Sequence, residues 1–198
     1  MNDNMLGNLN IGGKMILAGQ ILLAVCCGFY IPWWFMVFRP GQPHNWMAGR
    51  AGILLLLTFL AGLAGLVLTL WGDSGVGADR ALFSGNKVMA LGIAICFLMM
   101  IFTSTVFHRP VTTELLLITG WAVLELVTVN KLYGTEIFER PLAIVLCALI
   151  AAAFIVNMVL YIAYYRLDAW NAYRLAAVPL AVDGVYMAAL AAVIVRLA

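Results

Sequence analysis

Six long apolar stretches, separated by short polar segments, dominate the sequence. A helix needs about 20 mostly apolar residues to cross the hydrocarbon core of a bilayer, and each stretch reaches that length. The predicted spans are roughly residues 15–38, 51–71, 88–107, 111–133, 141–165 and 172–195. These spans and their short links use the whole chain and leave no room for a soluble domain. We therefore predict a single transmembrane domain over residues 1–198.

The links between the spans contain residues that begin or end helices. Pro110 and Pro141 are predicted helix starts, because a proline in the first turn leaves no amide hydrogen unsatisfied. Pro32 and Pro179 lie within spans and predict local kinks or breaks. The tight turn at residues 108–110 makes the third and fourth spans an antiparallel hairpin. The predicted fold class is all-α: a polytopic integral membrane helix bundle of six transmembrane helices arranged as three helical hairpins.

Composition supports a membrane protein and excludes several other classes. The 198 residues are 65% hydrophobic and only 10% charged, whereas about 25% of a soluble domain is charged. The same apolar composition, with only four cysteines, excludes disordered, collagen-like and disulfide-rich proteins. A net charge of +2 without a Lys/Arg-rich run gives no reason to expect nucleic acid as a partner. We expect a multi-pass protein of a bacterial inner (cell) membrane, in contact with membrane lipids.

The first apolar run is predicted to be a retained span rather than a cleaved signal peptide. It is longer than a signal-peptide core and ends in aromatic residues without a small-residue cleavage site. Its aromatic residues suit an interfacial belt at headgroup depth, with a ligand-stacking wall as the alternative. This run comprises Tyr30, Trp33, Trp34, Phe35 and Phe38.

Two short segments resemble each other at the starts of the first and third spans. Residues 14–19 read KMILAG and residues 87–92 read KVMALG. An internal repeat of helical hairpins explains this match, and such repeats occur in membrane carriers. Independent placement of cations at membrane boundaries explains it equally well. The eleven Lys and Arg residues divide almost evenly between the two membrane sides, so they do not set the orientation.

Three acidic residues lie inside predicted spans, where each costs about 2.5–3.5 kcal/mol on insertion scales. Glu114 is close to the start of its span, where the helix dipole favours a carboxylate. Glu125 and Asp183 lie near the middle of theirs, each about 16 or 17 residues after an arginine at the boundary. Glu125 and Asp183 are therefore expected at similar depth in the membrane.

Other polar and aromatic residues share a helical face with these two carboxylates. Trp121 lies one turn before Glu125, Tyr186 lies one turn after Asp183, and the fifth span carries Asn157 and Tyr161 on one face. These faces either line a central polar cavity or form hydrogen bonds that hold the bundle together. The predicted substrate- or ion-binding residues are Glu125, Asp183, Trp121, Asn157, Tyr161 and Tyr186.

Small residues mark a second type of surface. Ala61 and Gly65, flanked by Gly62 and Ala64, favour close helix packing, either within the bundle or with a partner subunit. Residues 151–153, all alanine, form a second patch of this kind. We expect either a homo-oligomer or a complex with a partner membrane subunit.

No catalytic motif, metal-ligand spacing or nucleotide-binding loop occurs in the sequence, so no catalytic residue, metal site or cofactor is predicted. The leading hypothesis is a small membrane protein that binds or translocates a small solute or ion through a central polar site. One alternative is a membrane-embedded enzyme acting on a lipid or isoprenoid near His108, Arg109 and Asp168. Another is a non-catalytic accessory subunit that packs through the small residues of the second span.

Overall fold

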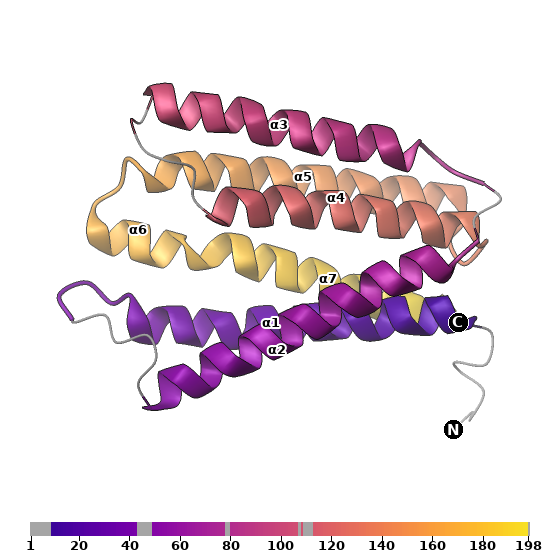
Figure 1. Ribbon diagram of the computed structural model, residues 1–198, viewed down its shortest axis with the longest axis horizontal. Coiled ribbons are helices and arrows are strands. Elements are labelled where there is room, and N and C mark those ends of the chain that lie inside the picture. The colour runs from indigo at the N-terminus through magenta and orange to yellow at the C-terminus, as the bar shows by residue number, and fades with distance from the viewer. Residues whose placement is uncertain (1–8, 43–48, 78–79, 107, 109–112, 198) are drawn as a thin grey trace. The chain divides into compact units, whose positions relative to one another are not determined.

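The computed structural model describes residues 9–42, 49–77, 80–106, 108 and 113–197. It is 86% helical, and no strand occurs in these ranges. Six segments are long and apolar enough to cross a membrane, so the predicted all-α polytopic fold is confirmed (Figure 1). The helices are α1 (Ile11–Val37), α2 (Gly49–Gly75), α3 (Gly85–Val106), α4 (Thr113–Gly134), α5 (Arg140–Tyr164), α6 (Ala169–Leu175) and α7 (Ala177–Leu197).

The last span consists of two consecutive helices, α6 and α7, separated at Ala176. Pro179 lies four residues after Leu175, the last residue of α6. A proline ring clashes with the carbonyl group four residues earlier, so Pro179 accounts for the interruption. Helix α1, in contrast, continues through Pro32 to Val37. Pro141 lies in the first turn of α5, as predicted, and Pro110 is outside the described residues.

The chain divides into two compact units. Unit 1 contains α1, α2, α6 and α7, and unit 2 contains α3, α4 and α5. The first and second predicted hairpins each lie within one unit, and the third is divided between the units after Arg166. The single domain over residues 1–198 stays a prediction.

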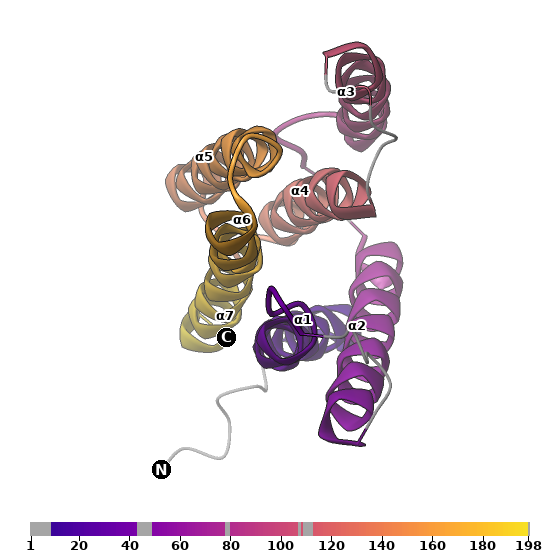
Figure 2. The ribbon, with the colours of Figure 1, turned by 90° about the vertical axis from the view of Figure 1, so that its left-hand side faces the viewer.

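Within unit 1, α1 packs against both α2 and α7 (Figure 2). Glycines bring the backbones of α1 and α2 together at two places, seven residues apart on each helix. A Cβ atom added at Gly72 would lie 2.8 Å from the carbonyl oxygen of Gly12, and one added at Gly19 would lie 2.8 Å from that of Gly65. Small residues permit such close approach in membranes. The predicted small-residue surface of the second span is therefore used, at Gly65, for contact with α1.

A similar contact joins α3 and α4 in unit 2. A Cβ atom at Gly92 would overlap with the side chain of Val123. Gly19 and Gly92 occupy the same position in the matching segments at residues 14–19 and 87–92, and both contact the next helix of their hairpin. This shared role agrees with an internal repeat, which stays a hypothesis. Of the other predicted patch, Ala151 and Ala152 are exposed.

The end of α1 is tied to α6 by two hydrogen bonds. The indole Nε1 of Trp34 donates to the carbonyl oxygen of Tyr173 over 3.0 Å. The hydroxyl of Tyr173 donates to the carbonyl oxygen of Phe35 over 2.6 Å. The last carbonyl groups of a helix have no partner within it, and Tyr173 satisfies one of them. The aromatic residues at this end of α1 therefore also hold α6 in place.

Asp168 is the N-cap of α6. Its carboxylate accepts hydrogen bonds from the backbone N–H groups of Trp170 and Asn171 and from the side-chain amide of Asn171. The side-chain hydrogen bond from Asn171, followed by that from its backbone, lowers the pKa of Asp168. Asp168 thus starts the helix in the way an N-cap aspartate is expected to.

Candidate functional site

The six predicted site residues are divided between the two units. Trp121 and Glu125 on α4, with Asn157 and Tyr161 on α5, belong to unit 2. Asp183 and Tyr186 on α7 belong to unit 1. The structure therefore brings the predicted residues together as two groups, each built around one carboxylate.

The unit 2 group lies on the packed faces of α4 and α5. Glu125, near the middle of α4, and Asn157 on α5 are both 0% exposed. Ile118 of α4 and Tyr161 of α5 belong to one buried cluster. Because the two helices are antiparallel, this pairing places Asn157 level with residue 122, within one turn of Glu125.

Hydroxyl groups accompany this carboxylate and amide. Thr128, one turn after Glu125, is 0% exposed. The hydroxyl of Tyr161 accepts a hydrogen bond from that of Tyr165 over 3.1 Å, and Trp121 is half-buried one turn before Glu125. The α4–α5 interface therefore carries amide, hydroxyl and indole groups within about two helical turns of Glu125 on either side.

Helix α4 differs from its neighbours in unit 2 in how much of it is shielded. In the most apolar stretch of α4, half of the residues are buried. The corresponding shares are 11% in α3 and 22% in α5. Polar groups have no hydrogen-bonding partner in lipid, so a span that carries them must turn them toward protein. Glu125, Thr128 and Asn157, all 0% exposed, follow this rule.

The unit 1 group lies where α7 packs against α1. Asp183 and Tyr186 are buried one turn apart on α7. A Cβ atom added at Gly184 would lie 3.0 Å from the Cβ atom of Cys27, so the two helices are very close beside Asp183. Gln20, two turns before Cys27 on the same face of α1, is 0% exposed. A buried carboxylate, a phenol and an amide therefore belong to the packed helices of unit 1.

Sequence reasoning missed one buried carboxylate. Asp73 is only 5% exposed, although its surroundings, GDSG, predicted a polar loop. Helix α2 continues through it to Gly75, and the neighbouring Gly72 contacts Gly12 at the first turn of α1. The N-terminal end of a helix favours a nearby carboxylate. The matching seven-residue spacings of the glycines in α1 and α2 are the one sequence signal for this contact.

The residues of the predicted enzyme alternative do not form a described site. Asp168 caps α6, His108 is exposed with a φ of 52°, and Arg109 lies outside the described residues. His44 and the side chain of Glu114 also lie outside them. Among the described side chains, no three His, Cys, Asp or Glu are grouped so that they could hold a metal ion.

Comparisons with protein families, curated proteins and solved structures gave no match. The two carboxylate groups are therefore interpreted from their own chemistry. Each group contains an acid that can carry a proton or a cation, and amide or hydroxyl groups on the same packed helices.

Proposed function

We propose that this membrane protein binds or translocates a small solute or ion, using the carboxylates buried in its spans. The observation that carries the proposal is the complete burial of Glu125 in the middle of α4, with the equally buried Asn157 of α5 level with it to within one helical turn. An ionised carboxylate at this depth has lost its water and needs a proton, a cation or hydrogen-bond donors. Protons, small cations and cationic solutes are the ligands that this chemistry favours.

The cost of these residues argues for a functional role. Apolar residues of similar volume would pack the same helices without the penalty of burying an ionisable group. Both compact units nevertheless contain a buried carboxylate in a span, Glu125 in unit 2 and Asp183 in unit 1. Two carboxyl groups that can each gain and lose a proton or a cation suit a protein that takes up and releases such an ion.

The accessory-subunit alternative has less support. It depended on the small residues of the second span as a surface for a partner. Gly65 instead contacts Gly19 and Leu23 of α1. This part of the surface is already occupied within the protein.

The test uses purified protein in vesicles that contain a pH-sensitive dye. A potassium diffusion potential drives proton entry, with sodium present or absent outside. Wild-type protein should conduct above protein-free vesicles, and Glu125→Gln and Asp183→Asn should each slow the flux by about tenfold, as expected for loss of roughly 1.4 kcal/mol of stabilisation. Both variants keep the shape and hydrogen-bonding capacity of the side chain while removing its charge.

Glu139→Gln is the matched control, because Glu139 is exposed before α5. It should leave the flux unchanged. Infrared difference spectra of wild-type and Glu125→Gln protein give a second reading, since a protonated carboxyl group has its own C=O stretching band. If the Glu125 and Asp183 variants fold normally and match the wild-type flux across pH, both carboxylates are structural and the proposal fails.

A further inference from the structure

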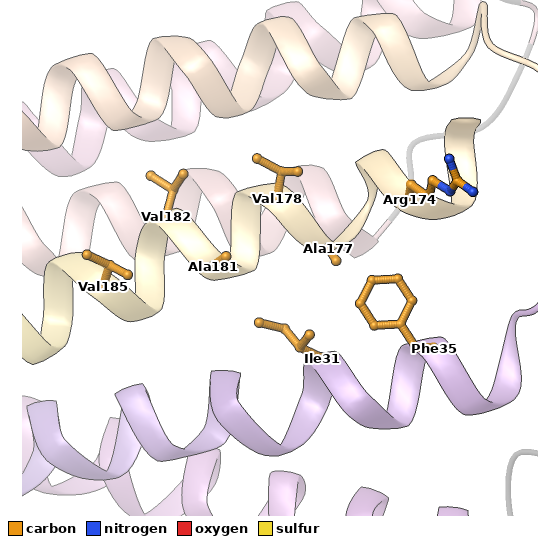
Figure 3. A pocket seen from close by; sticks show the side chains of 8 residues that line it. All are labelled: Ile31, Phe35, Arg174, Ala177, Val178, Ala181, Val182 and Val185. Atoms are coloured by element: carbon orange, nitrogen blue, oxygen red, sulfur yellow. The ribbon is translucent and has the colours of Figure 1, made fainter. Parts of the chain in front are cut away.

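A groove of about 560 Å³ runs between α1 and the α6–α7 segment of unit 1. Figure 3 shows Ile31 and Phe35 of α1 pointing toward Ala177 and Ala181 of α7. The alanines are too small to fill the space opposite the larger side chains, which explains why the groove is open here. Its volume is within the range of small-molecule sites in proteins.

The groove is apolar along its length and basic at one end. Val178, Val182 and Val185 continue the lining along α7, and Arg174 of α6 lies at the end (Figure 3). Arg174 is exposed. No salt bridge joins it to a carboxylate among the described residues. The positive charge of Arg174 therefore lies at the end of the apolar groove.

The basic end is at the depth of lipid headgroups. The last span, Ala169–Leu197, has 29 residues, more than the roughly 20 that cross the hydrocarbon core, so Arg174, in its first two turns, lies toward the headgroup end. Trp170 and Tyr173, which occur beside Arg174 in α6, are of the types enriched at membrane interfaces. The apolar length of the groove is correspondingly within the hydrocarbon core.

The two hydrogen bonds from Trp34 and Tyr173 fix this end of the groove. They join the end of α1 to α6 beside Phe35 and Arg174. These hydrogen bonds hold the two walls of the groove in place before a ligand binds. Binding therefore costs less free energy for ordering the protein.

We propose that this groove binds one anionic phospholipid, with its phosphate on Arg174 and an acyl chain along residues 177–185. The guanidinium group matches a phosphate in charge and in bidentate hydrogen-bond geometry. The apolar lining extends for about 12 Å along α7, calculated from the helical rise. A phospholipid carries its anionic phosphate at one end of an apolar chain, which is the order in which Arg174 and the apolar lining follow one another along the groove.

The test is native mass spectrometry of the full chain, delipidated in detergent and titrated with phosphatidylglycerol or phosphatidylcholine. Arg174→Gln should weaken retention of phosphatidylglycerol by about tenfold, as expected for loss of charge-assisted hydrogen bonds. Arg174→Lys should recover part of that loss. Arg196→Gln, at the opposite end of α7, is the matched control and should bind as the wild type does.

A second variant tests the apolar part of the groove. Ala181→Phe fills the space between α7 and α1 and should weaken retention of both lipids, whereas Ala192→Phe, exposed farther along α7, should not. Thermal melting at the wild-type temperature establishes that each variant is folded. Unchanged phosphatidylglycerol retention in folded Arg174→Gln or Ala181→Phe protein overturns the proposal. Displacement of the lipid by glycerol phosphate alone, with Ala181→Phe unaffected, also overturns it by showing a headgroup-only site.

Discussion

Gly19 of α1 and Gly65 of α2 face each other reciprocally. A Cβ atom on Gly19 would lie 2.8 Å from the carbonyl oxygen of Gly65, and one on Gly65 would lie 3.0 Å from that of Gly19. A methyl group fits at neither position without a shift, because backbone atoms of the facing helix lie within 3.0 Å in addition to the side chains of Thr69 and Leu23. The first hairpin therefore depends on both residues being glycine.

Gly19→Ala and Gly65→Ala should each destabilise the protein by about 1–3 kcal/mol, the usual cost of overpacking. The measurement is the unfolding transition in detergent. Gly28→Ala is the control on the same helix, because a Cβ atom there meets nothing within 4 Å. Alanine also has the higher helix propensity, so this control should be neutral or slightly stabilising. Identical transitions for all three variants would show that α1 and α2 do not pack this closely.

The six-span topology predicts which loops share a membrane side. Cysteine introduced at Gln42 should react with a membrane-impermeant maleimide from one side, and cysteine at Ser74 or Glu139 from the other. All three positions are exposed. Gln42 is preferable to its neighbour Gly41, whose φ of 83° disfavours a side chain. Labelling of Gln42→Cys and Ser74→Cys from the same side would contradict the passage of α2 through the membrane.

Tyr173→Phe should loosen the attachment of α6 to α1. The substitution removes the hydroxyl that donates to Phe35 and keeps the aromatic ring, whose centroid lies 5.3 Å from that of Phe35. Loss of one such hydrogen bond is expected to cost about 1 kcal/mol. Hydrogen–deuterium exchange of a peptide covering α6 should therefore become faster.

Tyr164→Phe provides the comparison for Tyr173→Phe. Tyr164 is half-buried against the ring of Tyr165 in unit 2. Its substitution should leave exchange in α6 unchanged. Equal exchange of α6 in wild-type and Tyr173→Phe protein would mean that the hydroxyl does not hold this helix.

The cap of α6 should stabilise the protein in a pH-dependent way. Hydrogen bonds from Asn171 and Trp170 lower the pKa of Asp168 in the folded state. A depressed pKa adds stability above the ordinary aspartate pKa, and that stability is lost as the pH falls through the folded value. Asp168→Ala should thus lower the melting temperature at neutral pH, and the difference from wild type should narrow in acid. A difference that is constant from neutral to acidic pH would rule out this role of the charge.

Part of the candidate site could be predicted from sequence because a polar or charged side chain in an apolar run is conspicuous. Glu125, Asn157 and Asp183 were selected for that reason, and all three are buried. Asp73 was missed because glycine and serine neighbours made its segment look like a loop, whereas contact with α1 extends the helix through it. Which polar residues surround each acid depends on how the neighbouring helices are aligned. The pattern on one helix does not specify which face of which other helix it will contact.

The sequence by itself determined that this is a six-span helical membrane protein. Span length and apolarity are properties of each segment alone, since lipid accepts any continuous apolar helix that satisfies its own backbone. A proline within a span also marked the break before α7, at Pro179, although α1 continues through Pro32 and such a proline alone does not decide whether its helix breaks. Only the tertiary structure decided that Gly65 packs on Gly19 and that the hydroxyl of Tyr173 donates to the last turn of α1. It also decided that alanines on α7 leave a groove beside Arg174. Those choices depend on which faces of separate helices meet, and packing energy between them is absent until the helices have associated.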